Sequence, residues 1–195
     1  MSPARTREYR GQKYLDVRIG DEKRRLPIVA AGKDVWIASD AELVLGDVQF
    51  IQTCAGLLVK RIGDLRVELI ITAEAKSIPL AYAVATLLGH ERFIIVRKSV
   101  KGYMKEFLEE EVKSITTREK QKLILSDEDR RSIERKRVCI LDDVVSTGKT
   151  LVALERLIAR AKGIVACKCA IWREGPWYKG KDLICLDTLP IFIKR

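Results

Sequence analysis

The stretch from Val138 to Thr150 limits the possible folds of this chain more than any other, because it joins a strand, two acids and a helix start. Residues 138–141 form a short apolar run of β-prone residues, which is typical of a buried strand. Asp142 and Asp143 follow at once, and two valines lead into a polar turn and then an amphipathic helix. A turn of hydroxyls, glycine and free backbone N–H groups at a helix N-terminus can bind a phosphate. The two carboxylates beside it suit ribose hydroxyls or a divalent cation.

The end of this stretch, Gly148-Lys149-Thr150, also suggests the P-loop of nucleotide hydrolases. That loop needs a glycine five residues before its second glycine, and Asp143 stands there. Two carboxylates and two valines also occupy positions where the loop needs flexible, uncharged backbone. No GxGxxG fingerprint follows any predicted strand, which argues against a dinucleotide-binding fold. The sequence therefore favours a different kind of phosphate site.

Strands and helices alternate through the rest of the chain. We expect strands at 67–72, 93–96, 138–141 and 164–171, and helices at 47–62, at 79–88 and after Thr150. This order is typical of an α/β fold with a mostly parallel sheet flanked by helices, and the chain, 1–195, fits one domain. Ligands of such sheets bind at the carboxyl ends of the strands. We therefore expect three turns to face one crevice: Glu74–Ser77, Arg97–Lys98 and Asp142–Thr150.

Charge and hydropathy exclude some classes of protein and leave others open. No apolar run approaches the length of a membrane span, and the first residues lack the apolar core of a secretory signal, so we expect a cytoplasmic protein. The net charge of +10 is compatible with nucleic acid, a polyanionic small molecule or an ordinary solvated surface. The five cysteines lack the spacing of a metal site, so we expect free and mostly buried thiols, with Cys167 and Cys169 on one face of a strand.

Two segments depart from the alternation. Residues 99–125 contain β-like pieces at 112–117 and 122–125, which we interpret as a flexible β-ribbon lid over the crevice; a solvated hairpin without a role is the alternative. The first dozen residues are charged and are expected to fray, and 14–29 are expected to form an antiparallel hairpin. Trp36 lies in a further extended piece, where it is either a core residue or a ring exposed to a base.

The run from Val138 to Thr150 resembles the phosphoribosyl diphosphate (PRPP) binding motif of type I phosphoribosyltransferases. Four hydrophobic residues, two acids, two hydrophobic residues and Ser-Thr-Gly-x-Thr make up that pattern. Residues 74–77 lie where the family has its pyrophosphate loop, and the insertion at 99–125 matches the family's flexible catalytic loop. Segments 1–45 and 172–195 resemble the small hood of the purine branch. The chain is most similar in these features to adenine phosphoribosyltransferase-like proteins.

The resemblance implies a role for each group of residues. The 5′-phosphate and ribose of PRPP would be bound by Asp142, Asp143, Ser146, Thr147, Gly148, Lys149 and Thr150. Pyrophosphate would be bound by Glu74, Ala75, Lys76, Ser77, Arg97 and Lys98. The base would contact Trp36, Ile37 and Val144. Mg²⁺ would bind at Asp142 and Asp143, mainly through PRPP and water, and the catalytic candidates are these two acids and Lys105, with Tyr103 and nearby glutamates as other lid candidates.

These roles imply a Mg²⁺-dependent enzyme of purine salvage that transfers the 5-phosphoribosyl group of PRPP to a purine base, with adenine as the expected base, and releases pyrophosphate. The resemblance also implies a homodimer with small-molecule substrates and no membrane partner. The chain departs from the adenine enzymes in three places: Lys149 replaces a glycine, Ala75-Lys76-Ser77 replaces Ser-Arg-Gly, and Ile37-Ala38 replaces Arg-Asp. The alternative is a non-catalytic regulator that senses PRPP and binds nucleic acid. The charge permits it, but the first 45 residues contain no predicted helix-turn-helix, so a nucleic-acid partner is not expected.

Overall fold

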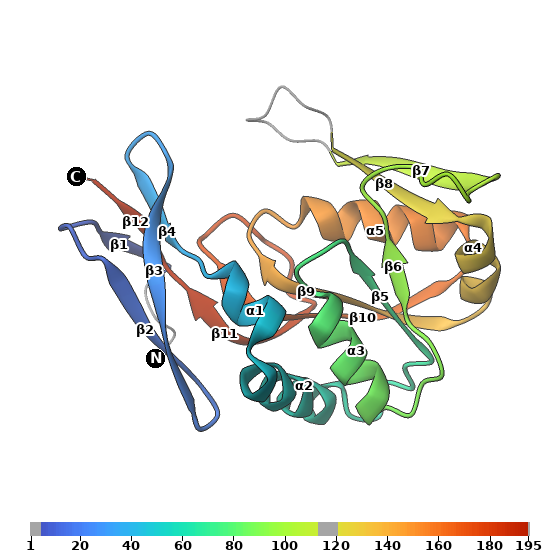
Figure 1. The fold of residues 1–195 in the computed structure, drawn as a ribbon, viewed down its shortest axis with the longest axis horizontal. Helices are drawn as coiled ribbons and strands as arrows, with labels where there is room; N and C mark the ends of the chain where they lie inside the picture. Colours follow the sequence, from blue (N-terminus) through green and yellow to red (C-terminus); the bar gives the residue numbers. More distant parts are fainter. Residues whose placement is uncertain (1–4, 113–120, 195) are drawn as a thin grey trace.

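The structure is a computed structural model that describes residues 5–112 and 121–194. Its centre is a five-stranded sheet in the order β11-β10-β9-β5-β6, and every neighbouring pair is parallel. The strands of this central sheet are β5 (Leu69–Ala73), β6 (Ile94–Val96), β9 (Arg137–Val145), β10 (Ile164–Glu174) and β11 (Leu183–Leu189). The parallel sheet that the sequence predicts is therefore confirmed (Figure 1).

Helices cover both faces of the central sheet (Figure 1). One side carries α1 (Ala41–Gly46), α2 (Val48–Ile62) and α3 (Ile78–Leu87), and the other carries α4 (Asp127–Ile133) and α5 (Lys149–Arg160). Successive strand residues point to opposite faces, so each strand contributes to two cores: Ile70 and Cys139 pack with α2 and α3, and Ile71 and Ile140 pack with α5. Among the described residues, no helix combines the length and apolar character that crossing a bilayer requires.

Local signals begin and end the helices where the sequence predicts. The Asp47 carboxylate accepts a hydrogen bond from the backbone N–H of Phe50 (2.9 Å) at the start of α2, and Gly63 follows the end of that helix with a φ of 51°. At the start of α4, the Ser126 hydroxyl accepts from the N–H of Asp129 (3.2 Å). Such caps satisfy N–H groups that have no partner inside the helix. Both caps lie at helix starts, and Asp47 is the residue at which the sequence predicts the first long helix to begin.

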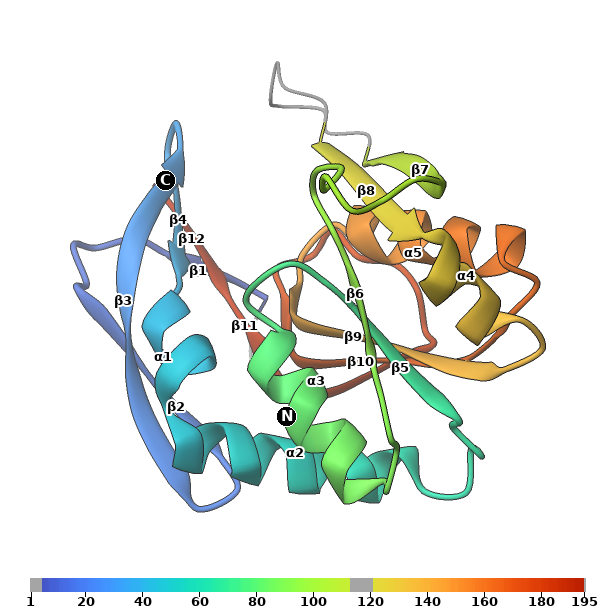
Figure 2. The ribbon, with the colours of Figure 1, turned by 45° about the vertical axis from the view of Figure 1, so that its right-hand side comes forward.

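A second, mixed sheet forms the hood. Its order is β1-β12-β4-β3-β2, and Figure 2 shows it standing to one side of the central sheet. Its strands are β1 (Thr6–Glu8), β2 (Tyr14–Ile19), β3 (Glu22–Gly32), β4 (Val35–Ala38) and β12 (Ile191–Ile193). The predicted hairpin corresponds to β2 and β3, which pair antiparallel. The expected fraying of the first dozen residues is wrong for β1, because this strand pairs in parallel with β12.

The C-terminal segment contributes less to the hood than the expected range 172–195. Of its described residues, β12 alone belongs to the hood sheet, because β10 continues to Glu174 and β11 adds a fifth strand to the central sheet. Trp172 is buried, and its ring stacks on that of Phe50 with 5.6 Å between centroids. The chain that follows α5 therefore extends the central sheet with β10 and β11 before it joins the hood at β12.

The region expected to be a lid contains a two-stranded antiparallel ribbon, β7 (Phe107–Val112) and β8 (Gln121–Ser126). Its first strand lies earlier than the predicted 112–117, and the tip, 113–120, lies outside the described residues. Arg97 forms an antiparallel bridge with Ile124 of β8, and Arg160 of α5 donates a hydrogen bond to the Glu109 carbonyl (2.7 Å). The base of the ribbon is thus held beside β6 and α5 (Figure 2).

Candidate active site

A pair of carboxylates lies near the carboxyl end of β9. Asp142 and Asp143 converge on the hydroxyl of Ser77 in the β5–α3 turn, whose Oγ lies 2.9 Å from Asp142 Oδ1 and 3.1 Å from Asp143 Oδ1. The same oxygen accepts a hydrogen bond from the backbone N–H of Asp143 (2.8 Å). The hydroxyl has a single proton, so it donates to one carboxylate at a time. Asp143 is only 4% exposed, so these contacts fix its carboxylate in a largely water-free position.

Cationic side chains surround the β5–α3 turn. Lys76 Nζ lies 2.9 Å from Asp143 Oδ2, and Arg97, which follows β6, lies 3.1 Å from a Glu74 oxygen. The other Glu74 oxygen accepts the backbone N–H of Lys98 (3.1 Å), and this hydrogen bond is the largest cause that lowers the pKa of Glu74. The turn therefore connects the carboxyl ends of β5, β6 and β9.

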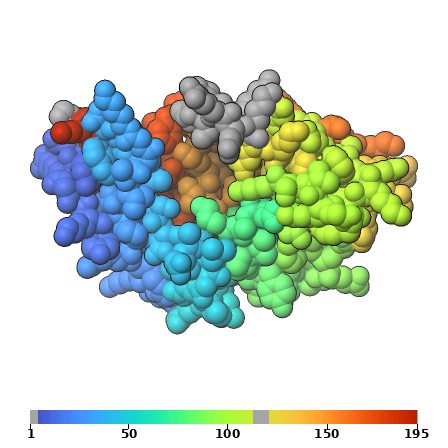
Figure 3. Space-filling view, turned by 45° about the horizontal axis from the view of Figure 1, so that its top comes forward, coloured from blue at the N-terminus to red at the C-terminus, as the bar shows by residue number. Residues whose placement is uncertain are grey.

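Two adjoining cavities open beside the acid pair. The larger, of about 190 Å³, is lined by Ala73, Glu74, Ala75, Lys76, Ser77, Lys98, Gln121, Asp142, Asp143, Val144 and Thr150. The smaller, of about 120 Å³, is lined by Asp142 and by residues 144–151. The two share Asp142, Val144 and Thr150, so together they form one crevice. Figure 3 shows the segment around the end of β9 at the floor of a hollow between the hood and the ribbon. The structure thus brings the three turns singled out in the sequence to one edge of the sheet.

The turn before α5 has the features of an anion site. Gly148 adopts a φ of 78°, a left-handed conformation that residues with a side chain avoid, and a Cβ at this position would overlap the ring of Tyr178. The helix begins at Lys149, so N–H groups in its first turn have no partner inside the helix. Ser146 and Thr147 line the same small cavity as this helix start. Backbone dipoles and hydroxyls there favour a phosphate group.

The acid pair suits a hard divalent cation. Burial, with the adjacent charge of Asp143, raises the pKa of Asp142 above its usual range, because two neighbouring carboxylates resist double ionisation. A divalent cation would relieve that repulsion, and carboxylate oxygens are the protein ligands that Mg²⁺ prefers. Lys76 supplies one positive charge to this pair. The donor set therefore fits Mg²⁺ that takes its remaining ligands from water and an oxygen-rich substrate.

The structure adds one acid that the sequence did not single out. Glu174, the last residue of β10, is 8% exposed; Ser146 donates a hydrogen bond to its carboxylate, and the charges of Lys76 and Asp143 act on it. Burial raises the pKa of Glu174. The predicted strand stopped at Ile171, which left Glu174 in the following loop. Extending that strand by three residues would have placed this acid at the carboxyl edge with the others.

Some residues that the resemblance implied lie elsewhere. Lys105 and Tyr103 line a separate cavity of about 360 Å³ beside the start of α4. Trp36 and Ile37 lie on β4 in the hood and are not among the described residues that line the two crevice cavities, and Trp36 stacks on the Tyr9 ring (3.9 Å between centroids). Val144 lines both cavities of the crevice. Of the base-contact candidates, Val144 is thus the one that this arrangement brings to the acid pair.

A parallel sheet that ends in an acid pair and a phosphate-sized turn defines an α/β protein whose crevice suits an anionic group beside a cation. Residues 45–186 match the family model described as "Phosphoribosyl transferase domain". This match covers more than half of the chain, so the chain belongs to the type I phosphoribosyltransferase family.

Relatives with assigned activities support the same family. A "Hypoxanthine/guanine phosphoribosyltransferase" of Methanococcus voltae is 32% identical over 169 residues, which cover 83% of this chain and 83% of the relative. A protein of the same name from Methanothrix thermoacetophila is 34% identical over 116 residues, 59% of this chain, and the chain spans only 56% of that relative. Among solved structures, adenine phosphoribosyltransferase from Thermoanaerobacter pseudethanolicus gives a TM-score of 0.69 at 23% identity, over 84% of this chain and 95% of that one. This last likeness establishes the fold.

Proposed function

We propose that this protein is a Mg²⁺-dependent purine phosphoribosyltransferase of the salvage type, which transfers the 5-phosphoribosyl group of PRPP to a purine base and releases pyrophosphate. One observation carries the proposal: a single crevice contains the Asp142–Asp143 pair, the phosphate turn before α5 and the cationic β5–α3 turn. These three features match the three parts of PRPP, namely ribose, 5′-phosphate and diphosphate. The names of the relatives point to purine bases.

The geometry suggests how PRPP would lie. The residues from Ser146 to Thr150 would hold the 5′-phosphate with hydroxyls and backbone N–H groups. Asp142 and Asp143 would hold the ribose hydroxyls and contribute to a Mg²⁺ site, and Mg²⁺ would neutralise the diphosphate when bound. The β5–α3 turn and Lys98 would contact the leaving pyrophosphate.

The reaction itself needs positioning more than covalent catalysis. A nitrogen of the base attacks ribose C1 while the bond from C1 to the pyrophosphate oxygen breaks, through an oxocarbenium-like state, and the proton of that nitrogen leaves to pyrophosphate or to water. Lys76 would stabilise the charge that develops on pyrophosphate, and to do so it must leave Asp143, which it contacts at 2.9 Å. Its side chain is about half exposed, which leaves it free to change rotamer. Exclusion of water by the ribbon would protect the intermediate state from hydrolysis.

The base is the less determined part of the proposal. Adenine is our first choice, from the sequence resemblance and the fold of the adenine enzymes; hypoxanthine and guanine are the second, because curated relatives carry that name. Val144 lies at the crevice, whereas Trp36 and Ile37 lie on β4 of the hood and do not line either crevice cavity among the described residues. We also place the protein in the cytoplasm, on the same resemblance.

Pyrophosphate release with PRPP, Mg²⁺ and each of adenine, hypoxanthine, guanine and xanthine tests the function directly. We expect turnover with one or more of these bases and none without Mg²⁺. PRPP binding at micromolar concentration without turnover for any base would contradict the enzyme and favour a PRPP-sensing regulator. Salt-sensitive binding to generic DNA, which persists when PRPP saturates the protein, would favour the same alternative.

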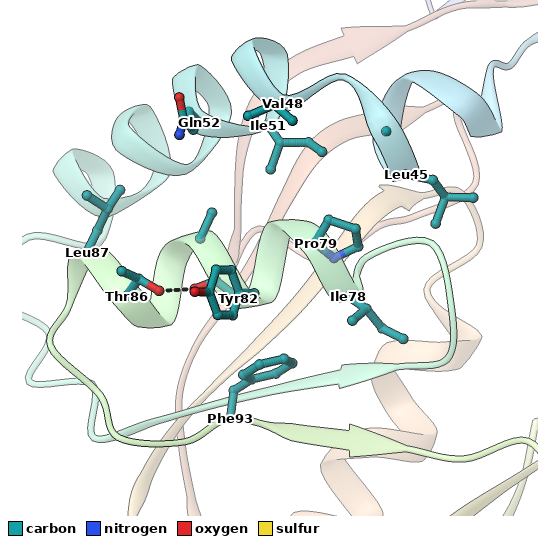
Figure 4. Close-up of a pocket in the computed structure, with 12 residues that line it drawn as sticks. Leu45, Val48, Ile51, Gln52, Ile78, Pro79, Tyr82, Thr86, Leu87 and Phe93 are labelled. Atoms are coloured by element: carbon teal, nitrogen blue, oxygen red, sulfur yellow. Dashed lines mark hydrogen bonds between the residues drawn. The ribbon is translucent and has the colours of Figure 1, made fainter.

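We propose further that the protein is a homodimer that associates through an apolar groove between α2 and α3, shown in Figure 4. The groove has a volume of about 670 Å³ and is lined mainly by apolar residues of α1, α2 and α3. Val48, Tyr82 and Leu87 border it and are 66%, 64% and 56% exposed. Apolar side chains gathered in one exposed groove are typical of an interaction surface. A second copy of the chain is the occupant that the family resemblance implies.

A further inference from the structure

Three of the five free cysteines meet in the interior of the central sheet. Cys139 lies on β9, and Cys167 and Cys169 lie on the neighbouring strand β10. Cys139 Sγ is 3.6 Å from Cys169 Sγ, Cys169 Sγ is 3.9 Å from Cys167 Sγ, and all three sulfur atoms lie within 4.8 Å of one another. We call these three residues the thiol cluster.

The cluster forms because of strand register. Cys139 pairs with Cys167 across the parallel β9–β10 ladder, and Cys169 lies two residues further along β10, so all three side chains point to the α2 side of the sheet. Linear spacing gave no metal signature, because one ligand comes from a different strand and is far away in sequence. The juxtaposition is therefore a property of the fold, and chain spacing alone could not show it.

The sulfur separations match those around a bound thiophilic ion. A centre bonded to three sulfur atoms at about 2.3 Å holds them about 3.4 to 3.8 Å apart, depending on whether its angles are pyramidal or tetrahedral. The separations of 3.6 and 3.9 Å lie within and just above this range, and the third pair, Cys139 and Cys167, lies within 4.8 Å. Three thiolates could therefore hold one central atom without a change of strand geometry.

Charge decides which central atom fits. The cluster belongs to an apolar core, where a net charge is costly. Zinc with three thiolates would carry a negative charge and would need a fourth ligand, and the described residues provide no fourth cysteine, histidine or acid to this group. A trivalent metalloid with three thiolates is neutral and complete with three ligands. Soft thiolates also favour a soft centre.

We propose that Cys139, Cys167 and Cys169 form a binding site for a trivalent thiophilic metalloid, with arsenic(III) as the representative. Arsenous acid, As(OH)₃, would react with the three thiols to give the trithiolate and three water molecules. Three As–O bonds break and three As–S bonds form. Each thiol proton leaves with one hydroxide as water, and no atom changes its oxidation state. The proposal is independent of the proposed transferase activity.

Access to the site requires a local opening of the structure. Cys139 and Cys169 are fully buried, whereas Cys167 is 8% exposed, so we expect Cys167 to react first and the other two to follow. Binding should accordingly be slow and should accelerate under conditions that increase local opening below the unfolding midpoint.

Native mass spectrometry of the reduced protein with sodium arsenite tests the proposal. We expect one adduct whose mass gain equals one arsenic atom minus three hydrogen atoms, because all three hydroxides are lost. Cys167→Ser and Cys169→Ala should each abolish this adduct. Cys54→Ala, a buried thiol outside the cluster, and Cys185→Ser, a partly exposed one, should leave it unchanged. Circular dichroism checks that each variant is folded.

Several results would overturn the proposal. One is an adduct that keeps a hydroxide, which indicates two ligands; another is an adduct that survives in both cluster variants. Failure to form any adduct on prolonged incubation in sub-denaturing urea, where local opening is frequent, would also exclude the site. Zinc added in parallel should not compete, and stoichiometric zinc binding that depends on Cys169 would contradict the argument from neutral charge.

Discussion

At the scale of single residues, the Ser77 hydroxyl connects the two halves of the crevice. It lies within hydrogen-bond distance of both acids, and it accepts the backbone N–H of Asp143. Ser77 stands at the N-cap position of α3, but its side chain makes no cap hydrogen bond. The hydroxyl instead holds β9 against the β5–α3 turn, so it belongs to the site more than to the helix.

The substitution Ser77→Ala should therefore destabilise the protein. It removes a hydrogen bond to a buried carboxylate and one of the two acceptors of the Asp143 N–H, which still reaches Asp142 Oδ1 (2.9 Å), and this loss should cost about 1–3 kcal/mol in the free energy of unfolding. Urea unfolding measures the change. Ser99→Ala, which removes an exposed hydroxyl that contacts Lys101, should change stability by less than about 0.5 kcal/mol. Equal effects of the two substitutions would show that the Ser77 contacts do not stabilise the fold.

The substitution Asp143→Asn should weaken PRPP binding in the presence of Mg²⁺. The loss of the negative charge removes a cation ligand and a charged hydrogen-bond acceptor, worth about 1.5–3 kcal/mol, or roughly a tenfold to hundredfold loss of affinity. Isothermal titration calorimetry measures it. Asp21→Asn, on the exposed β2–β3 turn, serves as the control. Unchanged affinity in Asp143→Asn would disprove the assigned ribose and metal site.

The buried acid Glu174 should give the protein a measurable pH dependence. Burial raises its pKa above 4.5, the ordinary value of a glutamate, so in the window above 4.5 the folded state binds more protons than the unfolded state. The contribution of Glu174 to stability is thus fully present below the unfolded pKa and is lost as pH rises through the folded pKa. Glu174→Gln should remove the part of the pH-dependent loss of stability that comes from this carboxyl group.

Urea unfolding between about pH 4 and about pH 7 tests this difference, because the range spans the window in which a raised glutamate pKa acts. The stability of the wild type relative to Glu174→Gln should decrease as the pH rises. Glu91→Gln, on an exposed residue, is the control. A difference between wild type and Glu174→Gln that stays constant with pH would contradict the raised pKa.

At the scale of elements, the turn before α5 depends on one glycine. Gly148 combines a positive φ with close contact to the Tyr178 ring, which is itself fixed by a hydrogen bond to Asp182 (2.9 Å). Gly148→Ala should lower stability by about 1–3 kcal/mol through strain and displacement of the ring. The substitution should also weaken PRPP binding, because the turn before α5, which would hold the 5′-phosphate, is displaced together with residue 148.

Thermal unfolding and PRPP titration measure the effects of Gly148→Ala. Gly56→Ala is the matched control, since Gly56 lies within α2 with open space around its Cβ position. That change should stabilise the protein by up to about 1 kcal/mol through helix propensity. A Gly148→Ala protein as stable as the wild type would show that the ring can retreat without cost.

The elements that the sequence predicts well are those with strong periodicity. The apolar runs of β5 and β9 and the stripe of α2 are visible because the same residues that set the pattern also fill the core. The ends of strands are not visible in the sequence, because pairing with the neighbouring strands determines them. Trp172 and Arg173 of β10, for example, pair with Val144 and Val145 of β9. Because the predicted strand ended at Ile171 and not at Glu174, the sequence left Glu174 out of the site and assigned part of the central sheet to the hood.

Contacts between distant segments were also beyond the sequence. The strand β1 forms because it pairs with β12, which lies nearly the whole chain away in sequence. The local charge of the first residues predicted only a frayed end. The three turns of the crevice were predicted because a general rule places strand ends of parallel sheets at one edge. No comparable rule places Lys105 or Trp36, whose positions depend on the ribbon and hood, and their roles stay predictions.

At the scale of the whole molecule, the exposed groove between α2 and α3 should determine the oligomeric state. Tyr82→Glu places a charge where the proposed dimer would bury an apolar ring, and should shift the equilibrium toward monomer by more than about tenfold. Light scattering after size-exclusion chromatography measures it. Tyr14→Glu, on another exposed tyrosine that lies in the hood, should leave the dimer intact. A wild type that is monomeric at all concentrations would disprove the interface.

The ion pair between Lys76 and Asp143 has a consequence for the order of events in the crevice. The free protein already holds an internal cation at the acid that would help to bind Mg²⁺. Magnesium alone must compete with that ammonium group, whereas PRPP offers diphosphate oxygens to the displaced lysine and to the metal together. The two ligands should therefore bind cooperatively, and by thermodynamic reciprocity each should raise the affinity for the other by the same factor. On the proposed function, a tethered ammonium group would thus make the crevice selective for metal and sugar phosphate in combination.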